Sequence, residues 1–239
     1  MSRIRVSVVM PARNEEASIG HVLDEIPRAL VDHIIVVDNG SSDSTAEIAR
    51  ERGATVVRVD EPGYGRACLA GIARAGNDTD VIVVLDADHS DYPGELPLLL
   101  APIEAGEADF VIGSRVLGGA EPGALPWNQR FGNRLACRLI LLLYGARFTD
   151  MGPFRAIRRE ALESLGMRDP TYGWNVEMQA KAVIAGLRIR EVPVHYRRRI
   201  GTSKISGTVR GTFRAGYRII GTLLLYYPLY MSKRKVSKR

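Results

Sequence analysis

Short, unbroken runs of apolar and largely β-branched residues alternate with helix-like segments in the first half of this chain. Unbroken apolarity is typical of strands covered on both faces, and strands that alternate with helices form parallel sheets with right-handed crossovers. Helical patterns at residues 16–30 and 44–52 separate the first runs. The chain therefore predicts an α/β fold whose mostly parallel central sheet is flanked by helices. The runs are residues 5–10, 34–37, 55–59, 81–85 and 109–113.

The composition narrows the class of protein further. Hydrophobic residues make up 46% and charged residues 25% of the 239 positions, as in folded globular chains. Cys68 and Cys137 lack the spacing of a disulfide framework or a zinc site, and residues 1–9 lack a secretory pattern. We therefore expect a cytoplasmic protein.

Positive charge is concentrated at the C-terminal end. Residues 197–239 contain 12 of the 33 Lys and Arg residues and none of the 27 Asp and Glu residues. Such an asymmetry indicates an anionic partner for this segment. Residues 129–144 and 209–224 each place arginines four positions apart beside an apolar stripe. Each pattern fits either a helix on an anionic membrane surface or an ordinary surface helix packed on the core.

The apolar stretch at residues 219–231 bears on the membrane question. It contains Pro228 and is shorter than the roughly 20 residues that a helix needs to cross a bilayer. We expect the chain to associate peripherally with the inner face of the membrane, aided by the basic tail at 233–239.

Polar residues follow three of the predicted strands. Because ligands of open α/β sheets bind beyond the carboxyl ends of the strands, these loops are expected to converge on one crevice. The side chains that follow the second strand could accept hydrogen bonds from a base and a ribose, or could form an ordinary turn and helix cap. The loops are residues 11–15, 38–45 and 86–88.

Asp86 and Asp88 flank Ala87 directly after the apolar run at 81–85. Two carboxylates at the end of a buried strand are costly unless a cation or hydrogen-bond donors compensate their charge. Mg²⁺ or Mn²⁺ accepts carboxylate oxygens and would bridge them to a diphosphate. The alternative is a solvated turn or a helix cap. Together with the neighbouring loops, the pattern favours a divalent-cation site.

Several short motifs follow one another in a fixed order along the chain. They are VVMPARNE at 8–15, VVDNGSSDST at 36–45, GYGR at 63–66, LDAD at 85–88, GSR at 113–115 and RRIGTSK at 198–204. The succession resembles the family-2 glycosyltransferases of the GT-A, Rossmann-like fold. More narrowly, it is similar to the dolichyl- or polyprenyl-phosphate mannosyl- and glucosyltransferases.

The resemblance implies roles for individual residues. Asp86 and Asp88 would hold the metal, and Asp88, Glu177, Arg198 and Lys204 would act in catalysis. Glu177 would face the acceptor; the alternative is a structural carboxylate of its helix. The residues implied to bind the nucleotide and its phosphates are Pro11, Ala12, Asn14, Glu15, Asp38, Asn39, Asp43, Arg66, Asp86, Ala87, Asp88, Arg115 and Arg130.

The chain also departs from the family pattern. Ser90 stands where some relatives carry a metal-binding Gln, and Asp91 follows it. The loop at 63–66 has Tyr64 and Arg66 where many relatives have a Gly-Lys-Gly pattern. An arginine keeps the charge of a lysine but not its geometry. Residues 118–129 match no motif.

These observations predict a hexosyltransferase that moves a sugar from UDP-glucose or GDP-mannose to a polyprenyl or dolichyl phosphate, with inversion at the anomeric carbon and with Mg²⁺ or Mn²⁺. A phosphate monoester is largely dianionic near neutral pH, so it needs no strong general base. Arginines 197–199 and Lys204 are candidates to bind that phosphate. We expect a catalytic domain at 1–204 and a membrane-associating helical tail at 205–239.

Two alternatives stay open. The same fold could transfer sugar to a soluble hydroxyl acceptor, or could bind a nucleotide or a lipid phosphate without catalysis. A nucleic-acid partner is not expected, because the basic segment carries no recognition motif.

Overall fold

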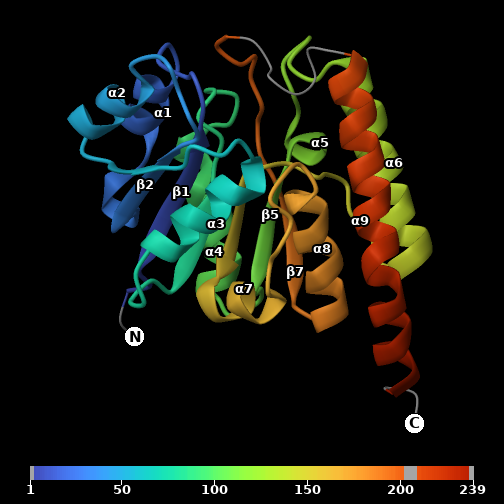
Figure 1. The fold of residues 1–239 in the computed structure, drawn as a ribbon. Helices are drawn as coiled ribbons and strands as arrows, with labels where there is room; N and C mark the ends of the chain where they lie inside the picture. Colours follow the sequence, from blue (N-terminus) through green and yellow to red (C-terminus); the bar gives the residue numbers. More distant parts are fainter. Residues whose placement is uncertain (1–2, 202–208, 237–239) are drawn as a thin grey trace.

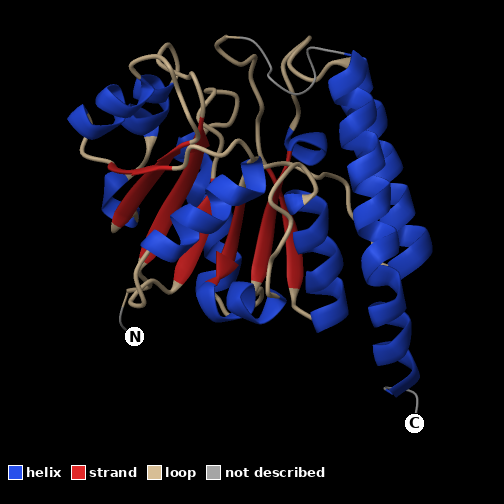
Figure 2. Ribbon diagram, viewed as in Figure 1, coloured by secondary structure: helices blue, strands red, loops and turns tan. Residues whose placement is uncertain are grey.

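The computed structural model describes residues 3–201 and 209–236, and its centre is a seven-stranded sheet. The strand order is β3-β2-β1-β4-β6-β5-β7. The pairs that β1 makes with β2 and β4, and those that join β2 to β3 and β5 to β7, are all parallel. The predicted α/β fold with a mostly parallel sheet is confirmed (Figures 1 and 2). The strands are β1 (Val6–Ala12), β2 (His33–Asp38), β3 (Thr55–Arg58), β4 (Val81–Val84), β5 (Phe110–Ser114), β6 (Arg155–Arg158) and β7 (Ile189–Pro193).

Strand β6 is the exception to the parallel arrangement. It inserts between β4 and β5 and runs antiparallel to both. Only four residues long, it reads Arg-Ala-Ile-Arg, so it lacks the apolar run that marked the other central strands. Its first residue, Arg155, is fully buried. This strand was not predicted, because one buried arginine interrupts its hydrophobic pattern.

Helices cover both faces of the sheet. The helix expected at 16–30 is divided, because Pro27 lacks a backbone N–H and a short 3₁₀ turn, Arg28–Leu30, follows it. A second 3₁₀ turn spans Pro93–Glu95. The α-helices are α1 (Ile19–Glu25), α2 (Thr45–Glu51), α3 (Tyr64–Arg74), α4 (Leu96–Glu104), α5 (Arg115–Gly118), α6 (Trp127–Tyr144), α7 (Arg159–Leu165), α8 (Trp174–Ala185) and α9 (Val209–Val236).

Two hydrophobic cores lie on opposite faces of the sheet. Side chains of a strand alternate between its faces, and along β1 Val8 and Met10 join one core while Val9 joins the other. Gly71 of α3 packs against the second core: a Cβ added there would lie 2.4 Å from Val9 and 2.9 Å from Val37. Glycine at this position lets α3 approach the sheet closely. The position of α3 in turn places the loop before it near the carboxyl ends of the strands.

A third core joins α6, α8 and α9. Ile140, Val176 and Leu223 are buried there together, and the Tyr144 hydroxyl donates to the carbonyl of Leu223 at 2.5 Å. Figure 1 shows α9 beside α6, with the C-terminal part of α9 running beyond it. Among the helices that the structure describes, none is long and apolar enough to cross a membrane. The boundary expected at residue 204 stays a prediction, although α9 packs on the body of the protein.

Candidate active site

The loops that follow β1, β2, β4 and β5 gather at one edge of the sheet, at the top of Figure 1. In the register, Ala12 pairs with Asp38 at the ends of β1 and β2, while Asp86 follows β4 by two residues. Pro11 is partly buried and Ala12 is buried within β1, and Ala87 is buried in the core below the loops. The parallel topology therefore brings together three segments that are far apart in the sequence.

Asp86 and Asp88 differ in their surroundings. The Tyr64 hydroxyl donates to Asp86 Oδ1 at 3.2 Å. Asp88 is buried; its Oδ1 accepts from the Ser90 amide at 3.0 Å and from the Ser90 hydroxyl, and its Oδ2 pairs with Arg199 Nη1 at 2.7 Å. Ser90 therefore orients Asp88, and Arg199 is the countercharge of Asp88 in this structure.

The charge balance of these acids fits a bound divalent cation. Burial and, second to it, the charge of Asp88 together raise the pKa of Asp86 to about 7. Asp91 is buried as well, and among residues 3–201 and 209–236 neither of its carboxylate oxygens has a hydrogen-bond partner. Burial and the charges of Asp86 and Asp88 raise the pKa of Asp91 well above its usual range. Acids that lack compensation in this way would gain from a cation.

The protein supplies only part of a coordination shell. Across residues 3–201 and 209–236, no three or more His, Cys, Asp or Glu side chains are grouped so that they could hold a metal ion. Mg²⁺ is commonly bound by one or two carboxylates together with substrate phosphates. Asp86 and Asp88 fit that arrangement, in which a nucleotide diphosphate completes the site.

The segment at residues 196–200 lies over this pair of acids. The Ile200 amide donates to the Asp88 carbonyl at 3.0 Å, and the Arg197 amide donates to the Ser90 carbonyl at 2.9 Å. Arg197 Nε also donates to the His89 carbonyl at 2.6 Å. The loop that holds the acids is thus bonded to the segment that leads to the Arg-x-x-Gly-x-Ser-Lys motif.

Helix α1 braces the same loop from the other side. Glu25 bonds His89 Nε2 at 2.8 Å and pairs with Arg197 at 2.6 Å. His89 has a φ of 64°, a left-handed backbone conformation that a non-glycine residue rarely adopts. Contacts from two other segments therefore hold a strained residue directly after Asp88.

The predicted nucleotide residues of the first two loops bond mainly to one another. The Asn14 amide donates to Ser41 Oγ at 2.9 Å, and Asn14 Oδ1 accepts from the Ser42 amide at 2.8 Å. The Glu15 amide donates to Thr45 Oγ1 at 2.8 Å. These bonds join the loop after β1 to the loop after β2, so the two loops form one rim of the crevice.

Asp38, Asn39 and Asp43 shape the same rim. Asp38 is buried, accepts from the Ser41 amide and pairs with Arg58 at 3.0 Å. Asn39 donates to two carbonyls of the loop before α3, at 3.0 and 2.8 Å, and its Oδ1 accepts from the Gly63 amide at 2.8 Å. Asp43 accepts from the Thr45 amide and hydroxyl. The turn-and-cap interpretation describes these bonds, and nucleotide contacts stay a prediction for the three residues.

Arg66 lies at the start of α3 and turns toward its own loop. It donates to the Pro62 carbonyl at 2.9 Å and pairs with Glu61 at 2.9 Å. The neighbouring Gly65 has no room for a side chain, since an added Cβ would lie 1.9 Å from the Asp169 carbonyl oxygen. Because Gly65 has no side chain, residues 169–171 can pack directly against this loop. This close contact explains why the motif has a glycine at position 65.

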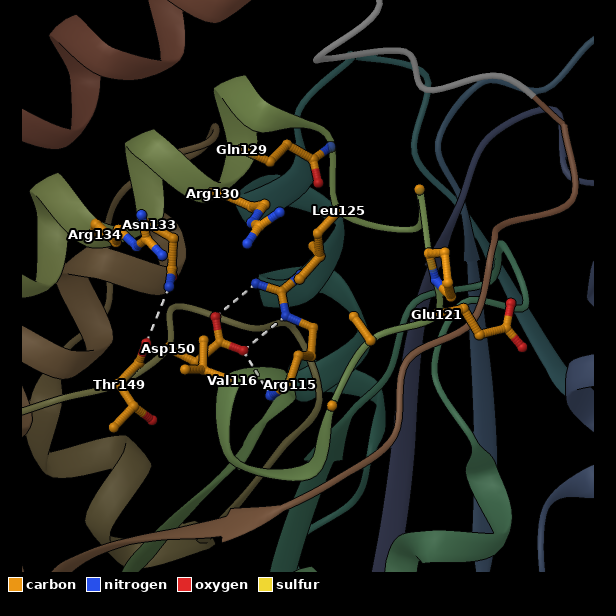
Figure 3. A pocket seen from close by; sticks show the side chains of 14 residues that line it. Arg115, Val116, Glu121, Leu125, Gln129, Arg130, Asn133, Arg134, Thr149 and Asp150 are labelled. Carbon is orange, nitrogen blue, oxygen red and sulfur yellow. Dashed lines mark hydrogen bonds and ion pairs between the residues drawn. The ribbon is translucent and has the colours of Figure 1, made fainter.

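A cavity of about 340 Å³ is lined by Arg115, a residue close enough to Asp86 to act on its charge (Figure 3). Its walls come from α5, α6, residues 119–125 and residues 149–150. Figure 3 shows Arg130 on α6 directed toward Arg115. Residues 119–125, which matched no motif, therefore form a wall of this cavity together with basic side chains.

The guanidinium groups of Arg115 and Arg198 are bonded to other residues of the cavity wall. Arg115 makes a two-pronged ion pair with Asp150, at 2.7 Å for each prong, and stacks over Tyr196. The Arg198 amide donates to Glu121 at 3.0 Å, and its guanidinium donates to the Pro122 carbonyl at 2.7 Å. Arg198 therefore fixes the wall at 119–125, while the exposed Arg130 reaches the cavity itself.

Glu177 and Lys204 complete the predicted set. Glu177 is fully buried in α8; it pairs with Lys181 at 2.8 Å and accepts from the Tyr226 hydroxyl and from the amides of Arg168 and Asp169. All of these partners belong to a packing network between α8, α9 and the loop before α8. Lys204 lies outside the described residues.

Sequence reasoning missed several contacts of the site. Tyr64 was noted only as a departure from a Gly-Lys-Gly pattern, yet it bonds Asp86. Glu25 and Asn133 belong to no motif, although Glu25 braces the acidic loop and Asn133 donates to the Thr149 carbonyl in the cavity wall. Arg199 was one of three adjacent arginines, and only the structure separates its partner, Asp88, from those of Arg197 and Arg198.

Comparison with known proteins places this geometry in a family. The sequence model described as glycosyl transferase family 2 matches residues 7–166. An uncharacterised glycosyltransferase of Mycobacterium tuberculosis is 40% identical over 212 residues, which cover 88% of this chain and 94% of the relative. A dolichyl-phosphate hexose transferase of Haloferax volcanii is 39% identical over 205 residues, covering 84% of this chain and 86% of the relative.

A solved structure shares the fold. Glucosyl-3-phosphoglycerate synthase of Mycobacterium tuberculosis, crystallised with Mn²⁺, UDP-glucose and phosphoglyceric acid, superposes with a TM-score of 0.77. The two sequences are 27% identical, and the match covers 95% of this chain and 80% of the other.

Proposed function

Because this chain belongs to glycosyl transferase family 2 and has the GT-A fold, we propose that it transfers a hexose from a nucleotide diphosphate sugar to a polyprenyl or dolichyl phosphate. The observation that carries the proposal is the adjacency of two features. Asp86 and Asp88 suit a divalent cation and a diphosphate, and the segment at 197–200 joins them to a cavity lined by basic side chains of α6. Arg199 pairs with Asp88, while the Arg198 amide donates to Glu121 in the cavity wall. A donor site beside an anion site is what transfer to a phosphate requires.

The donor half follows from charge. A nucleotide sugar bound in the crevice presents its diphosphate to Asp86 and Asp88 through Mg²⁺ or Mn²⁺, which would neutralise the charge of the leaving nucleotide. The solved relative was crystallised with Mn²⁺ and UDP-glucose. Asn14, Asp38 and Asn39 keep the rim in place for the base and ribose through the bonds between the loops.

The acceptor half follows from the cavity. Arg130 and Arg134 are exposed on α6 and line it. Arginine presents a planar fork of donors that suits phosphate oxygens. A lipid phosphate held here is already an anionic nucleophile, so catalysis would rest on positioning and charge neutralisation. Attack on the anomeric carbon from the side opposite the leaving diphosphate would give an inverted, β-linked product.

A membrane surface would deliver such an acceptor. Large apolar side chains are exposed on α5, α6 and α9, among them Trp127 at 79%, Phe131 at 62% and Tyr217 at 80%. The exposed Arg130, Arg134 and Arg138 lie on the same helix as the first two. Apolar rings beside cations suit the interface of an anionic bilayer. We place the protein on the inner face of the membrane, with the tail from residue 205 as part of the contact.

A soluble acceptor is the second candidate. It is favoured by the solved relative, which was crystallised with phosphoglyceric acid. The cavity of about 340 Å³ would also admit a small phosphorylated molecule. The relative whose name contains a dolichyl phosphate is, however, 39% identical to this chain against 27% for that synthase.

The experiment is a transfer assay with both acceptors. Purified protein, Mn²⁺ and a panel of UDP- and GDP-sugars are incubated with polyprenyl phosphate in vesicles or with phosphoglycerate, and labelled product is counted in each. Product in the lipid fraction supports the proposal. Product only with phosphoglycerate would establish the second candidate in its place.

A further inference from the structure

We propose that Arg199 serves as an internal substitute for the divalent cation, pairing with Asp88 until the cation binds and then leaving it. The inference deepens the proposed function, on which it rests, by assigning a role to a residue outside the recognised motif positions. Arg199 falls on an unspecified position of the Arg-x-x-Gly-x-Ser-Lys motif. Its partner is nevertheless one of the two acids that suit the metal.

The contact occupies the oxygen that a cation would need. Asp88 has two carboxylate oxygens; Oδ1 is bonded by the Ser90 amide and hydroxyl, and Oδ2 is bonded by Arg199 at 2.7 Å. The side chain of Asp88 is 7% exposed and that of Arg199 is 27% exposed. Oδ1 is held within its own turn, so Oδ2 is the oxygen that can change partner.

The charges make the pairing necessary in the cation-free protein. Asp88 and Asp91 are buried within three residues of each other, and Asp86 stands two residues before Asp88, so negative charge is concentrated around the Arg199 contact. A buried carboxylate that loses its only countercharge is strongly destabilising. A divalent cation supplies that countercharge itself, and the guanidinium next to it then experiences repulsion rather than attraction. Cation and Arg199 therefore compete for Asp88.

The backbone joins this competition to the acceptor segment. The Ile200 amide donates to the Asp88 carbonyl, so the residues on either side of the ion pair stay attached to the acidic loop. Arg197, two residues earlier, is held separately by Glu25 and by two carbonyls of that loop. Release of Arg199 therefore frees one guanidinium beside the donor site without detaching the segment. Such a guanidinium can bind the anion that arrives next.

The test measures Mn²⁺ binding rather than turnover. Mn²⁺ is titrated into native protein and into the Arg199→Gln, Arg199→Lys and Arg188→Gln variants, alone and with UDP or GDP, and free Mn²⁺ is followed by electron paramagnetic resonance. Competition predicts that Arg199→Gln binds Mn²⁺ about tenfold more tightly, which corresponds to roughly 1.4 kcal/mol. Arg199→Lys, which keeps a charge but loses the fork, is expected to gain less.

Arg188→Gln is the matched control, because it removes the same charge from an exposed ion pair with Asp109, which precedes β5 at the end of the strand opposite the site. Its Mn²⁺ affinity is expected to stay within twofold of the native value. Equal tightening in both Gln variants, or no tightening in Arg199→Gln, would overturn the inference. Native protein that binds no Mn²⁺ with either nucleotide would instead overturn the proposed function, and the inference with it.

A second measurement needs no variant. Native protein is treated briefly with phenylglyoxal, an arginine-selective reagent, with and without Mn²⁺, and the adducts are located by mass spectrometry. Release predicts that Mn²⁺ increases modification of Arg199 several-fold while modification of Arg197 stays constant. Unchanged or reduced modification of Arg199 would contradict the inference even if the variants failed to fold.

Discussion

The donor and acceptor sides of this molecule are built in different ways. On the donor side, the loops after β1, β2 and β4 hold each other through hydrogen bonds between backbone and short polar side chains, as at Asn14, Asp38 and Asn39. On the acceptor side, long side chains such as Arg130 and Trp127 stand exposed on α6. In the proposed function, the donor side is a frame already held in place by these bonds, whereas the acceptor side would need a partner surface to complete it. Substitutions should therefore fail in different ways on the two sides.

The largest effect is expected at Asp88, the acid at the centre of the donor frame. Asp88→Asn keeps the size of the side chain but removes the negative charge that, in our proposal, Arg199 and then the cation bind. We expect kcat to fall on the order of 10³-fold, since loss of charge stabilisation at a metal-held leaving group has effects of this size. Nucleotide release measured with saturating donor and lipid checks this. A kcat within tenfold of the native value would contradict the assignment of Asp88 to the cation and the donor diphosphate.

The next largest expected effect is on stability, and it concerns the buried Glu177 of α8. Burial alone would raise the pKa of Glu177, but Lys181, Tyr226 and two amides outweigh it and lower the pKa below its usual value. An acid with a lowered folded pKa stabilises the fold above its unfolded pKa, near 4.5, and that stability is lost as the pH falls through the folded value.

Glu177→Gln should therefore lower the free energy of unfolding by about 3 kcal/mol at pH 7, because it leaves Lys181 buried without its partner. Urea unfolding from pH 3 to 7 measures this, and the acid-dependent loss should be smaller in the variant. If the variant unfolds like native protein yet loses kcat, the acceptor-facing role predicted from the sequence is correct and the packing interpretation is wrong.

A smaller effect is expected on the membrane contact. Trp127 and Phe131 are exposed one turn apart on α6, and replacing both with Ser removes apolar area that a bilayer interface would bury. We expect binding to anionic vesicles to weaken about 30-fold, or roughly 2 kcal/mol, with little change in unfolding. Vesicle co-sedimentation tests this, with Leu98→Ser, an exposed apolar residue on α4, as the control. If Leu98→Ser weakened vesicle binding as much, the membrane contact could not be assigned to α6.

The smallest expected effect sharpens the acceptor site itself. Arg130→Gln removes one cation from the cavity without touching the ion pair between Arg115 and Asp150. We expect KM for the lipid phosphate to rise about tenfold, as for the loss of one charge-assisted hydrogen bond, while KM for the donor stays unchanged. Steady-state kinetics with each substrate varied in turn decide this. A change confined to donor KM would move Arg130 to the donor side.

The same contrast explains what could be predicted from the sequence. Strands β1 and β4 and the acids after β4 were predictable, because a buried parallel strand needs an apolar run and its polar end is local in the sequence. Strand β6 was not, because the buried Arg155 hides its pattern. The partner of Arg199 could not be predicted either, because Asp88 lies more than 100 residues away in the sequence. Three adjacent arginines cannot be distinguished by sequence, and only the fold shows that Arg199 pairs with Asp88 and Arg197 with Glu25.

The most direct test of the central claim is transfer of labelled sugar from UDP-glucose and GDP-mannose to polyprenyl phosphate, with and without Mn²⁺, in native protein and in Asp88→Asn. We predict a labelled lipid from one of the donors that requires both the metal and Asp88. Labelled lipid formed equally without metal, or no labelled lipid from any donor alongside a labelled soluble product, would contradict it.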